Sequence, residues 1–157
     1  MKHQLTPTQA DSLKATKRKI IYPQYLPQGF QLKGVKVDRK HPETPNYSLW
    51  FLGPNNACFF VEMGTEVGDM IVQDKKENMV PRTSALRNPS LGETSFWNSP
   101  YYLGTDWFPP FHGTAYRLNG DVTVSEFAQD PGAIGQCKGR MNPSDLIKVG
   151  ESLDVIE

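Results

Sequence analysis

The chain has 157 residues, and its 17 basic and 17 acidic side chains give a formal net charge of zero. This length fits one domain, and the balanced charge gives no electrostatic reason to bind phosphate backbones or anionic membranes. No run approaches the roughly 20 apolar residues of a membrane span, and residues 1–14 lack the apolar segment of a signal peptide.

The first predicted element is a short helix within an N-terminal helix and tail, residues 1–19. Thr6 is a predicted N-cap, Pro7 the first helical residue, and Gln9 completes a capping box. Few apolar side chains, chiefly Ala10 and Leu13, can pack, so the helix is weakly amphipathic. The basic cluster that follows is typical of a solvated helix face; it comprises Lys14, Lys17, Arg18 and Lys19.

Residues 20–157 are predicted to form a single α+β domain. Apolar and polar residues alternate over 30–38, which predicts a half-buried strand, with a bulge where the phase slips at Gly34. A hairpin is predicted from strands 46–52 and 57–63 around the turn GPNN. Its alternate positions are nearly all apolar, so both faces should be covered.

Beyond Gly64 the strand signals are shorter. Residues 75–91 are predicted to be mostly loop, and short strands are predicted at 70–73, 94–97, 101–104, 114–120 and 121–127. The C-terminal helix, 142–153, is clearer, because Asn142 is a good N-cap and Pro143 a good first residue. Short connections imply antiparallel pairing, and this helix is the natural cover of the sheet.

The two cysteines, Cys58 and Cys137, have no CxxC or CxxH neighbours, which excludes the usual zinc motifs. Their separation fits a disulfide as well as two free thiols. A nucleophilic thiol would need a base, and of the three histidines only His112 has an ordered-looking neighbourhood. A Cys58–His112 dyad is therefore the enzymatic alternative.

The remaining polar residues give no catalytic or metal site. Glu62, Glu66 and Asp69 lack the spacing of an EF-hand and are interpreted as a solvated loop after a strand. Nucleotide-binding and serine-hydrolase motifs are absent from the chain. The sequence therefore predicts no metal, no cofactor and no nucleic-acid partner.

Residues 96–116 hold eight of the 17 aromatic residues of the chain. Such rings either pack on the sheet or form a recognition surface, since Trp and Tyr dominate binding hot spots. The predicted ligand or partner contacts within this stretch are Trp97, Tyr101, Tyr102, Trp107, Phe108, Phe111 and His112.

Three segments carry a resemblance to a known family: YPQYLPQGFQLKGVKVD at 22–38, YSLWFLGPNNACFFVEMGTEVGD at 47–69, and CKGRMNPSDLIKVGESL at 137–153. Together they resemble a bacterial and cyanobacterial extracytoplasmic domain family of unknown function, which includes outer domains of anti-sigma-factor and sporulation-associated membrane proteins. The resemblance implies a curved antiparallel β-sheet with a short N-terminal helix and a C-terminal helix packed on it. It also implies a Cys58–Cys137 disulfide.

The expected function is that of a non-enzymatic binding or protein-interaction domain, with an unidentified protein or small-molecule partner at the aromatic surface. The alternatives are a small thiol-dependent hydrolase or an accessory subunit of a membrane or photosynthetic assembly. The expected location is extracytoplasmic, in a periplasm or thylakoid lumen, if a signal or anchor was removed, and otherwise cytoplasmic. The family's usual N-terminal anchor is missing, and its Gly-rich loop is reduced to MGTEVGD.

Overall fold

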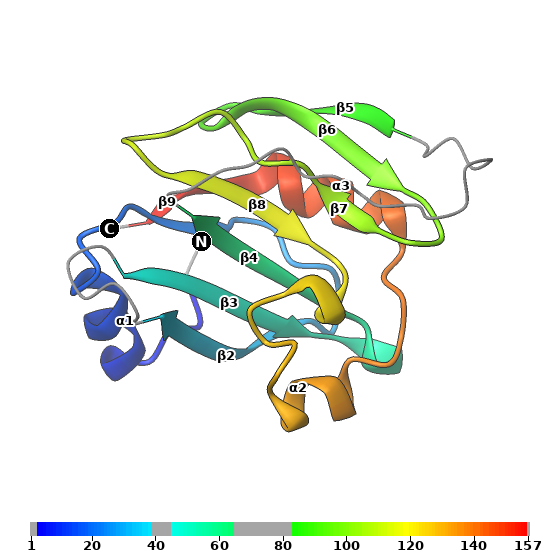
Figure 1. The fold of residues 1–157 in the computed structure, drawn as a ribbon, viewed down its shortest axis with the longest axis horizontal. Helices are drawn as coiled ribbons and strands as arrows, with labels where there is room; N and C mark the ends of the chain where they lie inside the picture. Colours follow the sequence, from blue (N-terminus) through cyan, green and yellow to red (C-terminus); the bar gives the residue numbers. More distant parts are fainter. Residues whose placement is uncertain (1–2, 39–44, 65–82, 157) are drawn as a thin grey trace.

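The computed structural model of the protein describes residues 3–38, 45–64 and 83–156. These residues form a mostly antiparallel β fold with a few helices (Figure 1). The helices are α1 (Pro7–Lys14), α2 (Pro131–Gln136) and α3 (Pro143–Ser152), with two 3₁₀ turns, η1 (Pro54–Asn56) and η2 (Val122–Val124). The strands are β1 (Ile20–Pro23), β2 (Gln31–Asp38), β3 (Asn46–Leu52), β4 (Cys58–Gly64), β5 (Thr83–Asn88), β6 (Gly92–Asn98), β7 (Leu103–Thr105), β8 (Ala115–Asn119) and β9 (Leu153–Ile156).

Two sheets organise these strands. The larger has seven strands in the order β2-β3-β4-β8-β7-β6-β5, and every pair in it is antiparallel. The smaller joins β1 to β9, which brings the two ends of the chain together. In the large sheet β7 and β8 share the single register pair Gly104–Asn119, so its two halves meet at a narrow join.

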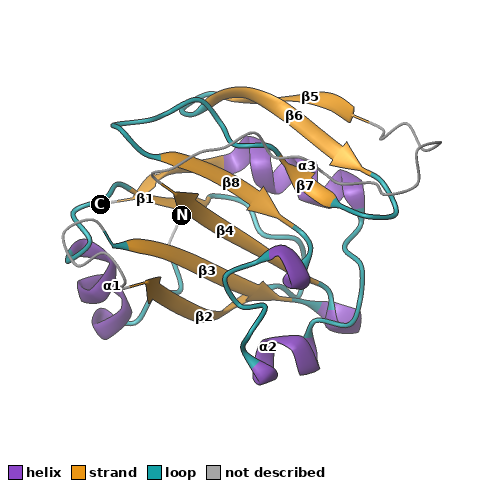
Figure 2. Ribbon diagram, in the orientation of Figure 1, coloured by secondary structure: helices purple, strands orange, loops and turns teal. Residues whose placement is uncertain are grey.

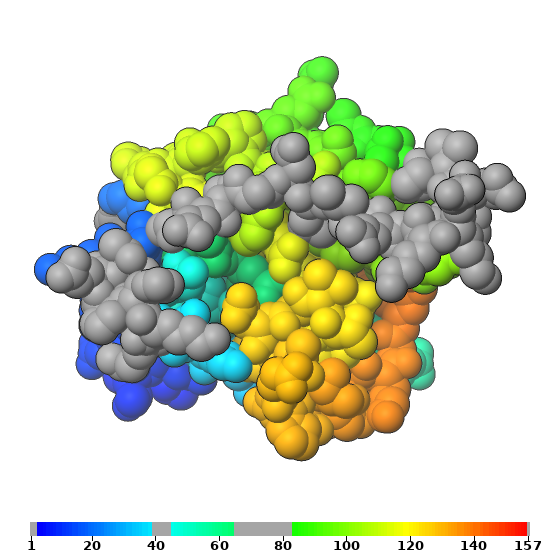
Figure 3. Space-filling model, viewed as in Figure 1, coloured from blue at the N-terminus to red at the C-terminus, as the bar shows by residue number. Residues whose placement is uncertain are grey.

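The large sheet is covered on both faces. Phe51 and Phe59 project into the main core, which also holds Leu146 of α3, while Trp50 and Phe60 project into a second cluster. Side chains alternate between the faces of a strand, so neighbouring residues of β3 and β4 feed different clusters. α3 lies behind the sheet and α2 in front of it (Figure 2). Residues 121–137 protrude from the front face of the molecule (Figure 3).

The best-supported sequence predictions are confirmed. α1 starts at a complete capping box between Thr6 and Gln9, and Asn142 caps α3 through Ser144 and Asp145. β2 carries an irregularity between Leu32 and Gly34, where the bulge was predicted. The hairpin β3–β4 forms around η1, and both of its faces are buried.

Other predictions are wrong or incomplete. The segment 75–91, predicted as mostly loop, contains β5, and 121–127 forms η2 and turns where a strand was predicted. The segment β1, the helix α2 and the strand β9 were not predicted. The strand predicted at 70–73 lies outside the described residues. α1 is anchored through Leu13, which is fully buried in the main core.

Candidate functional site

The aromatic stretch at 96–116 separates into core rings and surface rings. The core rings, at most 2 % exposed, are Phe96, Tyr102, Phe108 and Tyr116. The half-buried rings are Trp97, Trp107 and Phe111, and the exposed ones are Tyr101, at 38 %, and His112. The seven predicted contact residues therefore do not form one continuous exposed surface.

Tyr102 and Phe108 have their rings in the interior of the protein. The Tyr102 hydroxyl donates a hydrogen bond to the carbonyl of Thr105 at 2.9 Å, and burial raises its pKa. Phe108 belongs to the main core. A partner cannot contact either ring without opening the fold, so their role in this structure is packing.

The half-buried rings are held by neighbours within the stretch or across the sheet. Trp97 Nε1 donates to Asp106 Oδ1 at 2.9 Å, and the Trp107 ring lies 4.8 Å from the Arg117 guanidinium. Phe111 and His112 meet edge to face, with ring centroids 4.4 Å apart. Contacts therefore already orient these rings in the structure, which leaves Tyr101 as the exposed tyrosine of the set.

Cys58 and Cys137 form a disulfide with Cα atoms 5.4 Å apart, and they are 79 positions apart in the sequence. Trp50 Nε1 donates to Cys58 Sγ at 3.2 Å, so the buried sulfur also has a polar partner. Because both sulfurs are bonded, neither is a thiolate nucleophile. The Cys58–His112 dyad considered from the sequence is therefore not formed in this structure.

The residues from the disulfide to the start of α3, 137–142, are here called the strap. Gly139 N donates to Asn56 O at 3.0 Å, and Gly139 forms an isolated parallel bridge with Ala57. A Cβ atom at position 139 would overlap the carbonyl oxygen of Asn55. Arg140 Nη2 donates to Ser99 O at 2.7 Å. The strap is thus bound on one side to the β3–β4 turn and on the other to the β6–β7 turn.

An open pocket lies on each side of the strap, and together the two are called the strap groove. The first, of about 260 Å³, is bordered by the disulfide and by Pro100, Tyr101, Asp121, Thr123 and Lys138. The second, of about 440 Å³, is bordered by Tyr25, Phe30, Pro54, Asn55, Asn142 and Asp145. Arg140 lines both pockets. Each pocket also contains one exposed tyrosine, Tyr101 in the first and Tyr25 in the second, at 38 % and 39 % exposure.

Tyr25 and Arg140 were not among the residues predicted from the sequence. Tyr25 stands between Pro23 and Pro27, a setting that holds a ring out from the backbone on a stiff segment. That local signal could have drawn attention to it. Arg140 gave no such signal, because its position depends on the disulfide and on the turn at Ser99.

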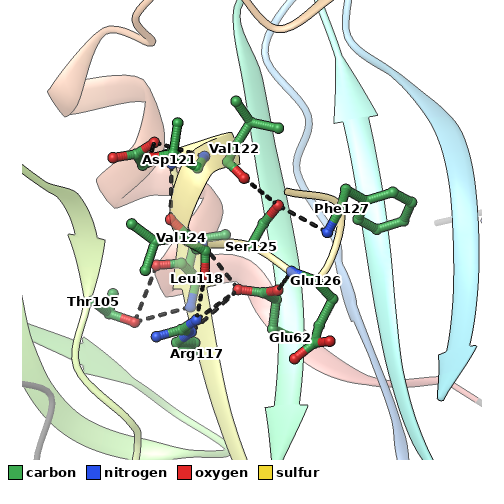
Figure 4. Close-up of polar contacts among 12 residues, drawn as sticks. Glu62, Thr105, Arg117, Leu118, Asp121, Val122, Val124, Ser125, Glu126 and Phe127 are labelled. Atoms are coloured by element: carbon green, nitrogen blue, oxygen red, sulfur yellow. Dashed lines mark hydrogen bonds and ion pairs between the residues drawn. The ribbon is translucent and has the colours of Figure 1, made fainter. Parts of the chain in front are cut away.

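Glu62 is buried, contrary to its interpretation as part of a solvated loop. It is 1 % exposed, and its Oε1 accepts hydrogen bonds from Arg117 Nε at 3.2 Å and Asn119 Nδ2 at 2.9 Å. Its Oε2 accepts from Glu126 N at 2.8 Å (Figure 4). Arg117 Nη2 lies 3.1 Å from Oε1. Glu66 and Asp69, from the same prediction, lie outside the described residues.

The hydrogen bonds of Glu62 hold two parts of the fold together. Both carboxylate oxygens of Glu62 are occupied by donors from β8 and from the turn after η2, so the group ties the sheet to the segment that covers its front face. Within the described ranges, no group of three or more His, Cys, Asp or Glu side chains is arranged to hold a metal ion. None of the described helices is long and apolar enough to cross a membrane.

No family model, curated protein or solved structure matches the chain. The resemblance to the extracytoplasmic domain family rests on the three sequence segments alone and stays a prediction.

Proposed function

We propose that the protein is a non-enzymatic binding domain whose partner occupies the strap groove. The observation that carries this proposal is the placement of Tyr25 and Tyr101, the two exposed tyrosines of the described residues, in the two pockets beside Arg140. Tyr and Arg are enriched among the residues that dominate binding energy. Of the contact residues predicted from the aromatic stretch, the proposed binding site keeps only Tyr101. It also includes Tyr25 and Arg140, which were not predicted.

The strap that borders the groove is held by contacts at both ends and in its middle. The disulfide fixes one end of the strap, the cap of α3 fixes the other, and Gly139 and Arg140 are bonded between them. A site that is already ordered loses little conformational entropy on association, so more of the contact energy becomes affinity. The two open pockets follow one another along the strap. Such an arrangement suits an extended polypeptide segment that places one side chain in each pocket.

The proposed setting is an oxidising, extracytoplasmic compartment. The Cys58–Cys137 disulfide supports it, because disulfides persist in such compartments and are rare where thiols are kept reduced. The same bond supports a binding role over thiol chemistry, since it uses both cysteines of the chain.

Selection of a random peptide library on the native, oxidised protein tests the proposed function. Enriched peptides should bind the wild type, and Tyr101→Ala or Arg140→Gln should weaken them by at least about tenfold, as expected for central contacts. His112→Ala is the matched control, because this exposed ring does not line the groove and its loss should leave affinity unchanged. Failure to enrich any peptide, or equal binding by the Tyr101 and Arg140 variants, would contradict the proposal.

A further inference from the structure

A third open pocket, with a strongly cationic lining, lies at the C-terminal end of α1. It has a volume of about 310 Å³, and its cationic lining consists of Lys14, Lys17, Arg18 and Lys19. Its apolar floor consists of Ile20, Val155 and Ile156, from the paired strands β1 and β9. None of the described residues that line it is acidic, and none of its four cations forms an ion pair with a described carboxylate.

The backbone next to these cations is held by hydrogen bonds to two buried tyrosines. The carbonyl of Lys19 accepts hydrogen bonds from the hydroxyls of Tyr47 at 2.9 Å and Tyr116 at 2.7 Å. Ile21 N donates to the Tyr47 hydroxyl at 2.8 Å. Lys17 has φ of 60°, a left-handed conformation that non-glycine residues seldom adopt. The backbone bonds thus hold the segment that carries the four cations against the sheet, with three of the cationic side chains exposed.

Arg18 lacks acceptors for part of its guanidinium. Its Nη1 donates to Thr114 Oγ1 at 3.1 Å, but Nε and Nη2 are shielded from solvent and have no hydrogen-bond partner in the described part of the chain. A buried donor without an acceptor costs free energy. Cations are favourable near the C-terminal end of a helix, which accounts for a lysine close to the end of α1. It does not account for Arg18, whose side chain turns toward Thr114.

We propose that this pocket binds a phosphate group carried by a partly apolar molecule. A phosphate offers several acceptor oxygens and more than one negative charge, which matches a pocket whose lining carries four cations, one of them an arginine with two donors that have no partner. The apolar floor then contacts the organic part of the ligand. The pocket shares no residue with the strap groove, so this site is independent of the proposed function.

Phenyl phosphate and inorganic phosphate are the direct probes, compared with sodium chloride at equal ionic strength. Both phosphates should bind the oxidised protein in calorimetry and raise its melting temperature more than chloride does. Phenyl phosphate should bind several-fold more tightly, because its ring covers the apolar floor. Melting temperatures that respond equally to phosphate and chloride, together with no measurable heat of binding, would overturn the proposal.

Variants locate the bound group. Lys17→Gln combined with Lys19→Gln changes only exposed side chains and should weaken phosphate binding at least about tenfold, whereas the exposed Lys33→Gln on β2 is the control and should leave it unchanged. Arg18→Met should abolish the phosphate response while the ligand-free protein melts no lower than the wild type, because the unpartnered donors are gone. Wild-type affinity in the lysine double variant, or equal weakening by Lys33→Gln, would refute the site even if Arg18→Met does not fold.

A sedimentation assay with vesicles identifies the source of the phosphate. Cosedimentation with phosphatidylglycerol vesicles, but not with phosphatidylcholine vesicles, that is lost in the lysine double variant would support a lipid headgroup. Binding of phenyl phosphate without cosedimentation would support a free phosphate compound. If neither the vesicles nor the soluble phosphates bind, the proposal is wrong.

Discussion

At the scale of single residues, the Glu62 carboxylate is the buried charge on which the front face of the sheet depends. Arg117, its ion-pair partner, has a side chain only 11 % exposed, and the guanidinium also donates to Val124 O at 3.1 Å. Buried pairs of this kind contribute little over an apolar replacement of both partners, but removing one partner leaves an uncompensated charge. The cluster should therefore be sensitive to single substitutions.

Glu62→Ala should lower the free energy of unfolding by about 3–5 kcal/mol, because Arg117 would remain buried without its carboxylate. Urea denaturation of the oxidised protein measures this loss. Glu93→Ala is the matched control, since Glu93 pairs with Arg87 at the surface, with side chains 53 % and 83 % exposed. Exposed pairs contribute about 0–1 kcal/mol to stability. If Glu62→Ala lowers the free energy of unfolding no more than Glu93→Ala does, the Glu62 cluster does not stabilise the fold.

At the scale of elements, the strap shows how a short irregular segment is positioned by contacts on both sides. It follows α2, is joined to the start of β4 by the disulfide, and ends at the cap of α3. Gly139 lies against the β3–β4 turn so closely that no side chain fits between them. The two pockets of the groove exist because the strap stays at this distance from the turns around it.

Gly139→Ala should destabilise the protein by about 1–3 kcal/mol, because the added methyl group must push the strap away from the carbonyl of Asn55. Gly135→Ala in α2 is the control: its Cβ would meet nothing within 4 Å, and replacing a helical glycine should be neutral or stabilise by up to about 1 kcal/mol. Thermal unfolding of both variants, with peptide binding as a second readout, measures the effect. Equal melting temperatures would contradict the packing described for the strap.

At the scale of the whole molecule, four tyrosines have hydroxyl groups held by hydrogen bonds, and three of them, Tyr22, Tyr47 and Tyr116, join segments far apart in the sequence. Burial raises the pKa of Tyr22, Tyr47 and Tyr102, and it raises the pKa of Tyr116 to about 12. Tyr47 and Tyr116 both donate to Lys19 O, which holds the segment before β1 against β3 and β8. The folded protein therefore keeps these hydroxyl groups protonated at pH values where the unfolded chain releases them.

This difference predicts alkaline destabilisation. Below pH 10 both states hold the tyrosine protons, and stability does not depend on these groups. As pH rises from 10 toward 12 the unfolded chain binds fewer protons than the folded protein, so the free energy of unfolding falls, by at most about 1.4 kcal/mol per pH unit for each tyrosine. Urea denaturation at pH 8, 10 and 11 tests this, and Tyr116→Phe should make the fall shallower. A wild-type stability that stays constant up to pH 11 would contradict it.

Local sequence signals were sufficient to predict the helices and strands that depend on residues near them in the chain. The capping box at Thr6, the cap at Asn142 and the apolar strands around the turn GPNN each depend on residues within a few positions, and each predicted its element correctly. β5 could not be predicted in this way, because only Leu86 and Asn88 of its residues are buried. Its structure depends on pairing with β6 and on Asn88, which donates to the carbonyls of Gly150 and Leu153 at 2.8 Å each.

The candidate site was less accessible to sequence reasoning. The aromatic stretch identified Tyr101 but gave equal weight to Tyr102 and Phe108, since nothing in adjacent rings tells which one faces the core. Glu62 was misinterpreted because its partners Arg117 and Asn119 lie more than 50 residues away and reach it through the β4–β8 register. The strap groove likewise depends on a disulfide between residues that are 79 positions apart in the sequence.

The disulfide is the feature on which the groove, the absence of a thiolate and the proposed oxidising compartment all depend. On the chain-entropy model, closing a loop of this length stabilises the fold by about 4–5 kcal/mol, a large part of a small domain's stability.

The most direct test is mass spectrometry of the native, non-reduced protein after alkylation of free thiols. We expect no alkylated cysteine and a cross-linked peptide containing Cys58 and Cys137. Two alkylated cysteines in the folded protein would contradict it, because the strap would then lack its anchor and Cys58 would be available as a thiol.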